Sequence, residues 1–140
     1  MKIVRNILAI IVGWAAGAFI NSALVMLGYA VYPVEGLDPN DMEALAATMP
    51  TLGAEHFIFP FLAHAVGTLM GAFFAGLIAA THKMKFALAI GVLNLIGGIA
   101  ACFMIPAPAW FMAVDLILAY IPMAWLGGMM AAKMTRRAQA

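Results

Sequence analysis

Four long apolar segments constrain this chain more than any other feature of its sequence. They cover residues 7–30, 57–81, 86–105 and 109–132. An α-helix rises about 1.5 Å per residue and the hydrocarbon core of a bilayer is about 30 Å thick, so about 20 residues are enough to cross it. The sequence therefore predicts an all-α integral membrane protein with four transmembrane helices.

The composition agrees with this class. Hydrophobic residues make up 66% of the chain and charged residues only 9%, whereas soluble proteins have about 25% charged residues. A length of 140 residues predicts a single domain covering residues 1–140. The first apolar segment exceeds the roughly 7–15 apolar residues of a signal peptide, so we expect it to be a helix of the mature protein.

The charged residues are segregated along the sequence. Basic residues lie before the first apolar segment, between the second and third, and after the fourth; they are Lys2, Arg5, Lys83, Lys85, Lys133, Arg136 and Arg137. Nearly all acidic residues lie in the loop over residues 31–56. The positive-inside rule then predicts a bacterial inner-membrane protein with both termini in the cytoplasm and the acidic loop outside. This pattern reports topology and gives no reason to expect nucleic acid as a partner.

The connections between the segments predict how the helices are arranged. THKMK joins the second segment to the third and PAP joins the third to the fourth, so each pair must form an antiparallel hairpin. The expected fold is an up-down-up-down bundle. In the acidic loop, Asp38 is a candidate N-cap and Pro39 a candidate first helical residue. With Pro50 as a stop, the loop predicts a short surface helix over about residues 39–48.

Small residues recur at four-residue intervals in the apolar segments, and residues four apart share a helix face. In lipid, helices associate through close packing and polar contacts, so such faces mark where backbones approach. The predicted packing residues are Gly13, Gly17, Gly67, Gly71, Ala75, Gly91 and Gly98. We expect the second helix to be the most enclosed. Helix faces of small residues that are not used inside the bundle predict self-association or packing against another membrane protein.

Polar residues within the segments fall on these same small faces. They are Asn21, His64, Thr68, Asn94 and Asp115. His64 and Asp115 each lie about 10 Å from the outer ends of their helices, because a helix rises about 1.5 Å per residue. The sequence therefore predicts one buried polar cluster in the outer half of the bundle.

Asp115 decides how this cluster must be built. An Asp at the centre of a spanning helix costs about 2.5–3.5 kcal/mol, so we expect it to face protein or a water-filled cavity. Three states are open: a protonated acid bonded to an amide, an ion pair with protonated His64, or a carboxylate holding a cation or water. Pro122 lacks a backbone N–H and is expected to kink the fourth helix nearby. The sequence predicts no cofactor, and it leaves a metal site undetermined.

Three functions are compatible with these residues. The first is a non-enzymatic accessory or structural membrane protein, in which polar side chains only bond helices together, at about 0.6 kcal/mol each. The main alternative is a carrier or channel-like protein for a proton, a small cation or a small solute. In that alternative His64 and Asp115 bind or titrate, and the other three polar residues orient them. A hydrolase using Ser22, His64 and Asp115 is the third; no G-x-S-x-G motif surrounds Ser22, so we do not expect an enzyme.

Three runs of the sequence resemble a group of small, uncharacterised bacterial inner-membrane proteins: EGLDPNDMEAL, HFIFPFLAHAVGTLMGAFFAGLIAATHKMKFALAIGV and PAPAWFMAVDLILAYIPMAWLGG. The resemblance covers most of the chain. It implies a protein with four spans, and it supplies no activity, substrate or catalytic residue.

Overall fold

The computed structural model describes residues 1–38 and 40–138. Every element in this described part is a helix, either α or 3-10 (η). In chain order they are α1 (Lys2–Val31), α2 (Met42–Thr48), η1 (Met49–Thr51), η2 (Ala54–Phe57), α3 (Ile58–Ile78), α4 (Lys83–Met104), α5 (Ala109–Leu118) and α6 (Ile121–Arg137). Four stretches are long and apolar enough to cross a membrane: α1, η2 with α3, α4, and α5 with α6. The predicted all-α class with four apolar helices is confirmed.

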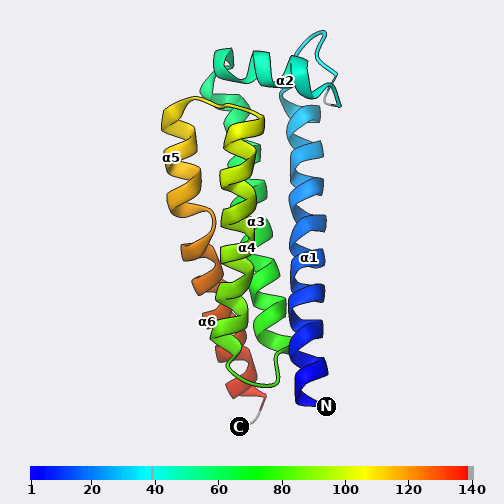
Figure 1. The fold of residues 1–140 in the computed structure, drawn as a ribbon, viewed down its shortest axis with the longest axis vertical. Coiled ribbons are helices and arrows are strands. Elements are labelled where there is room, and N and C mark those ends of the chain that lie inside the picture. The colour runs from blue at the N-terminus through cyan, green and yellow to red at the C-terminus, as the bar shows by residue number, and fades with distance from the viewer. Residues whose placement is uncertain (39, 139–140) are drawn as a thin grey trace.

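The long helices lie side by side along one axis, and α2 crosses one end of them (Figure 1). Both termini lie at the opposite end. α1 packs mainly against α3, which also packs against α4 and α6. The most apolar part of α3 is 44% buried, compared with 17%, 22% and 28% in the other three spans. The second span is therefore the most enclosed one, as predicted from its small residues.

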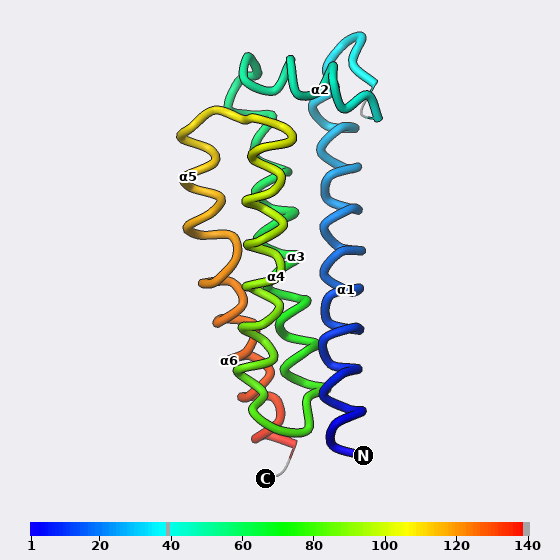
Figure 2. The backbone as a smooth tube through the Cα atoms, viewed as in Figure 1, coloured from blue at the N-terminus to red at the C-terminus, as the bar shows by residue number. Residues whose placement is uncertain are grey.

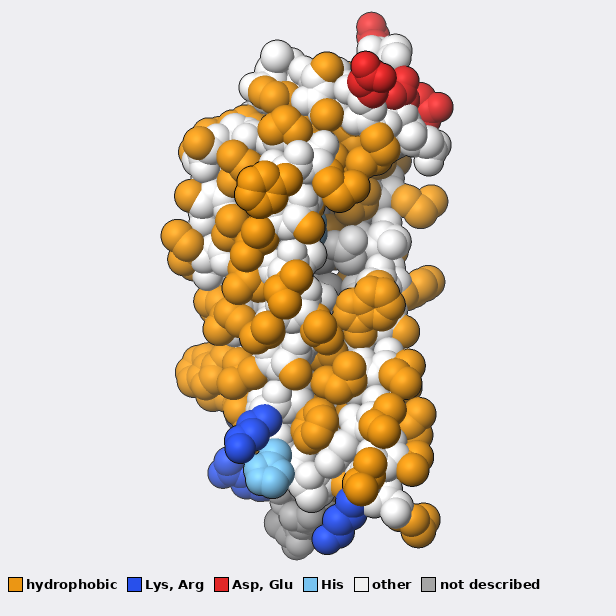
Figure 3. All heavy atoms as spheres, viewed as in Figure 1, with side chains coloured by type: hydrophobic (Ala, Val, Ile, Leu, Met, Phe, Trp, Pro, Cys, Tyr) orange, Lys and Arg blue, Asp and Glu red, His pale blue; other side chains and the backbone are white. Residues whose placement is uncertain are grey.

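Charge is separated along this axis as it is along the sequence. Acidic side chains gather at the end where α2 lies, and Lys and Arg side chains gather at the end that carries the termini (Figure 3). Large apolar side chains cover the surface between them. An apolar belt between two polar ends is the surface that a bilayer requires, and it indicates a membrane location.

The contact between α1 and α3 depends on glycine in both helices. A Cβ on Gly13 would lie 2.7 Å from the carbonyl oxygen of Gly71 and 2.8 Å from the Cβ of Ala75. A Cβ on Gly17 would lie 2.7 Å from the carbonyl oxygen of Gly67. Such distances are too short for a real side chain, so the two backbones touch directly. Close backbone approach of this kind supplies the packing energy that lipid-immersed helices need.

The remaining predicted packing residues also face other helices of the same chain. A Cβ on Gly91 would lie 2.5 Å from the Cβ of Ala124 in α6. A Cβ on Gly98 would overlap the side chain of Tyr120. Ala75 is fully buried in the core. Because these small residues are used within the chain, self-association stays a prediction.

The fourth span is interrupted between α5 and α6, and the tube trace bends there (Figure 2). Pro122 is in the first turn of α6. It cannot donate to the carbonyl of Leu118, and its ring crowds that carbonyl. The helix therefore stops at Leu118, and Tyr120 adopts φ −114° and ψ −79° before α6 begins. The predicted kink is thus a complete break.

The short helix in the acidic loop begins later than expected. α2 starts at Met42, and the side chain of Asp41 caps it by accepting from the backbone N–H of Ala44 at 3.0 Å. The expected cap, Asp38, instead accepts from the backbone and side-chain nitrogens of Asn40 at 2.9 and 3.0 Å. Pro39 lies outside the described residues. The prediction of Asp38 as the N-cap was wrong because two Asp residues compete and Asp41 directly precedes the run MEALAAT.

Side chains from neighbouring helices cap the C-terminal end of α3. The Asn6 Oδ1 of α1 accepts from the backbone N–H of Ala80 at 2.8 Å. Arg5 Nε donates to the carbonyl of Ile78 at 2.9 Å. Lys83 Nζ donates to two further carbonyls of the last turn at 3.1 and 3.0 Å. The last carbonyls of a helix have no partner within it, so these contacts fix α1 to the turn between α3 and α4.

Candidate ligand site between α1, α3 and α4

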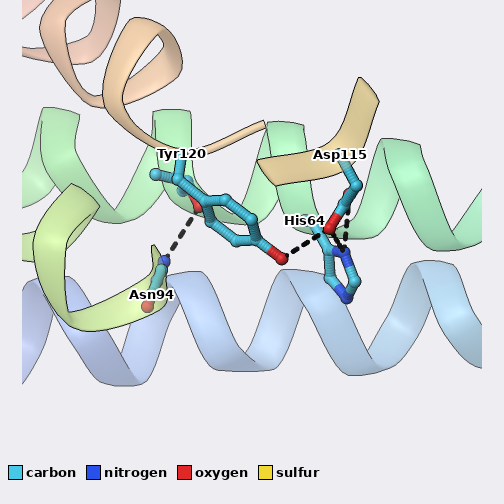
Figure 4. A network of polar contacts seen from close by, with 5 residues as sticks. His64, Asn94, Asp115 and Tyr120 are labelled. Carbon is cyan, nitrogen blue, oxygen red and sulfur yellow. Dashed lines mark hydrogen bonds and ion pairs between the residues drawn. The ribbon is translucent and has the colours of Figure 1, made fainter. Parts of the chain in front are cut away.

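Asp115 of α5 is a buried acid within an otherwise apolar helix, with only 4% of its surface exposed. The Nδ1 of His64, in α3, lies 2.9 and 3.0 Å from its two carboxylate oxygens. The Tyr120 hydroxyl donates to Asp115 Oδ2 at 2.8 Å. Figure 4 shows both side chains directed at the carboxylate. The predicted proximity of His64 and Asp115 is confirmed.

The partners of Asp115 bear on the first of the three states that its sequence context left open. Neither partner is an amide, so an acid bonded to Asn is not what the structure shows. The Tyr120 hydroxyl donates to the carboxyl group, and a single proton shared between His64 Nδ1 and the carboxyl completes the second hydrogen bond. The ring of His64 also stacks on that of Tyr120, with centroids 5.7 Å apart.

A second polar pair lies beside the first. Asn94 Nδ2, from α4, donates to Thr68 Oγ1, from α3, at 3.0 Å. Thr68 is almost fully buried, with 1% of its surface exposed. No hydrogen bond joins this pair to Asp115 among the described residues. The predicted single cluster is therefore two separate hydrogen-bonded groups.

A groove of about 310 Å³ connects the two groups. Figure 3 shows the molecule hollowed between α4 and α1. Four of the five predicted ligand residues line this groove, together with Trp14 and Tyr120; the four are Asn21, His64, Thr68 and Asn94. Asp115 lies behind His64 and lines an adjoining chamber of about 170 Å³ on the side of α2. The structure thus collects the predicted residues around one space.

Three polar groups at this groove lack a partner within the described part of the chain. They are the carboxamide of Asn21, the Nε2 of His64 and the Oδ1 of Asn94. All three side chains are half-buried, and the hydrocarbon of a bilayer offers them no hydrogen-bond partner. The groove is therefore suited to bind water or the polar atoms of a ligand.

The sequence did not identify Tyr120 as part of this site. On a continuous helix a residue five positions after Asp115 lies well round the cylinder from it, because successive residues are about 100° apart. The break before Pro122 turns Tyr120 back so that its hydroxyl reaches the carboxylate. The available signal was Pro122 together with a Tyr in an apolar run, since a buried Tyr hydroxyl usually finds a hydrogen-bond partner.

The structure does not bring together the residues of the two other sites considered from the sequence, a hydrolase site at Ser22 and a metal site. Ser22 is exposed on α1 and makes no hydrogen bond to His64 in the described structure. Within residues 1–38 and 40–138, no group of three or more His, Cys, Asp or Glu side chains could hold a metal ion. Comparison of the chain with protein-family models, curated proteins and solved structures finds no match.

Proposed function

We propose that this chain is a bacterial inner-membrane protein that binds a small solute or exchanges a proton at the pair His64 and Asp115. In this proposal the four spans form an up-down-up-down bundle with both termini in the cytoplasm and the acidic loop outside. The basic ends of α1, α4 and α6 support this orientation, because positively charged residues are retained on the cytoplasmic side.

One observation carries the functional part of the proposal. His64 commits Nδ1 to the Asp115 carboxylate and leaves Nε2 unpaired at a groove that holds three further polar side chains. A carboxylate on one ring nitrogen fixes the orientation and tautomer of an imidazole, so that its other nitrogen is presented for a ligand or a proton. If His64 served only to join helices, the fold would be more stable with both of its ring nitrogens hydrogen-bonded to other helices.

An accessory role with self-association is the second candidate. The observation that favours it is Gly97 of α4, where an added Cβ would meet no atom within 4 Å. Gly97 and Ala100 are both exposed, so they offer a small-residue face to a second copy of the chain or to another membrane protein. In this candidate the pair His64 and Asp115 only holds α3 against α5.

Thermal unfolding of the full chain in detergent, between pH 8 and pH 6 and with different alkali cations, separates the two candidates. The titratable groups that surround His64 are Asp115, Tyr120, Cys102 and Tyr29. The pair is assembled only in the folded chain, so a proton or cation that binds there should change the free energy of unfolding. We expect the unfolding temperature of the parent to change with pH or with the cation, and Asp115→Asn to abolish that response.

The comparison with Asp115→Asn controls for His56 and His82, which both proteins retain. If the parent shows no response to pH or cations, or if Asp115→Asn shows the same response, the binding proposal is wrong. The pair would then serve only to join helices, and cross-linking of the parent with a Gly97→Leu control would test the accessory role.

A further inference from the structure

We propose that the groove binds the head group of a lipid-soluble quinone that enters from the bilayer between α1 and α4. This inference rests on the proposed function and names the class of its ligand. The polar groups that carry it are those of Asn21, His64 and Asn94, which come from three different helices and surround one space.

The position of the groove determines which solutes reach it. Its lining residues lie in the middle of α1 and in the second half of α4, and Figure 3 shows the hollow within the apolar belt. Towards α2 the neighbouring chamber is mainly apolar, with Leu45, Met49 and Phe111 among its walls. Towards the termini, the contact of Gly13 with Gly71 closes α1 on α3. The side opening therefore faces hydrocarbon, where lipid-soluble compounds are concentrated.

The charged groups in and around the groove favour a ligand with an uncharged head group. No Lys or Arg lines the groove, so a phosphate group would enter without a countercharge. The nearest acidic group is the Asp115 carboxyl, which already has His64 and Tyr120 as hydrogen-bond partners. Burying an unpaired anion beside it would be strongly unfavourable. Phospholipid head groups are excluded on this ground.

The unpaired groups select a ligand with oxygen atoms on more than one side. A carboxamide both donates and accepts, and an imidazole nitrogen accepts when neutral and donates when protonated. These groups therefore match the carbonyls of a quinone and equally the hydroxyls of a quinol. A prenol offers a single oxygen atom, whereas a quinone or quinol offers two on opposite sides of its ring, so the prenol makes fewer of these contacts.

The size and walls of the groove suit a flat ring. A volume of about 310 Å³ is near the lower end of the roughly 300–1,000 Å³ typical of small-molecule pockets, which restricts it to one compact head group. Trp14 and Tyr120 contribute aromatic walls, and aromatic rings favour offset or edge-to-face contacts. Trp14 and Leu93 are exposed at the mouth, where the isoprenoid chain would leave towards lipid.

Tryptophan fluorescence provides a direct test, because quinones quench it and Trp14 is the one Trp at the groove. A Trp110→Phe/Trp125→Phe variant retains only Trp14, and a Trp14→Phe/Trp110→Phe variant retains only Trp125. Trp14 is 54% exposed and Trp125 49% exposed, so collisional quenching from the bilayer should be alike. In nanodiscs titrated with decylubiquinone, we expect saturable quenching of Trp14 and only linear quenching of Trp125.

Asn21→Leu in the Trp14-only background should weaken saturable quenching by about 3- to 10-fold, as expected for one lost hydrogen bond. Geranylgeraniol, an uncharged prenol, should not displace the quinone. Linear quenching of Trp14, an unchanged affinity in Asn21→Leu, or equal displacement by the prenol would each overturn the quinone assignment. If the pH response still depends on Asp115 in that event, the proposed function stands with a different ligand; if it does not, both fail.

Discussion

Gly98 of α4 lies where any side chain would overlap Tyr120: a Cβ there would be 2.6 Å from Cζ of the phenol ring. The same ring donates its hydroxyl to Asp115 at 2.8 Å. The absence of a side chain at Gly98 therefore sets the position of a donor to the buried acid. This glycine serves the polar site and not only the contact between helices.

Gly98→Ala should push Tyr120 away from Asp115. Over-packing of a close contact typically costs about 1–3 kcal/mol, and we expect a lower unfolding temperature in detergent. Gly97→Ala is the matched control, because an added methyl there meets nothing within 4 Å and Ala is the better helix former. Equal effects of the two substitutions would show that Tyr120 moves aside without loss.

Tyr120→Phe should remove the hydroxyl that donates to Asp115 while preserving the ring. A hydrogen bond to a charged group contributes about 1.5–3 kcal/mol, although interhelical bonds in membranes average nearer 0.6 kcal/mol. We expect destabilisation of about 1 kcal/mol, measured by thermal or denaturant unfolding. Tyr32→Phe, at the C-terminal end of α1, should be neutral. A neutral Tyr120→Phe would mean that His64 alone is sufficient to hold the carboxylate.

Gly17→Leu should separate α1 from α3, because its Cβ would lie 2.7 Å from the carbonyl oxygen of Gly67. We expect a loss of about 1–3 kcal/mol or more, as for other over-packed contacts, with faster hydrogen exchange in α1. Ala15→Leu adds similar bulk to an exposed position of the same helix and should leave exchange unchanged. Protection of α1 in both variants would indicate that the glycine contact is dispensable.

Asn6→Ala should release the start of α1 from the turn after α3. The substitution removes the acceptor for the Ala80 N–H at 2.8 Å and the donor to Thr81 Oγ1 at 2.9 Å. Two hydrogen bonds at about 0.5–1.5 kcal/mol each suggest a loss of about 1–3 kcal/mol. Hydrogen exchange of the turn measures it, and Asn40→Ala, in the acidic loop, is the control. Unchanged exchange at Ala80 would show that Arg5 and Lys83 cap the helix adequately.

The helices and their small faces are predictable from the sequence because length, hydropathy and a four-residue period each act locally. The pairing of His64 with Asp115 was also predictable, because both residues lie equally far from the same end of the bundle, in the second and fourth spans. Both inferences use only the helical rise and the requirement that polar groups in lipid find partners.

The remaining features depend on tertiary geometry. Tyr120 reaches Asp115 only because the helix breaks, and Asn94 pairs with Thr68 because of how α4 crosses α3. The groove exists because α1 packs on α3 and only sparsely on α4. None of these follows from a periodic pattern, since each depends on the relative rotation of two helices.

The glycine contact between α1 and α3 also has a consequence for biogenesis. α1 is synthesised before α3, but the surface that receives Gly13 and Gly17 belongs to α3, which emerges later from the ribosome. Until then, α1 must remain in the bilayer as a single span with its glycine face covered by lipid tails. Its strongly apolar sequence makes it stable as an independent span, so assembly can be completed after insertion, when lipid is displaced from the glycine face.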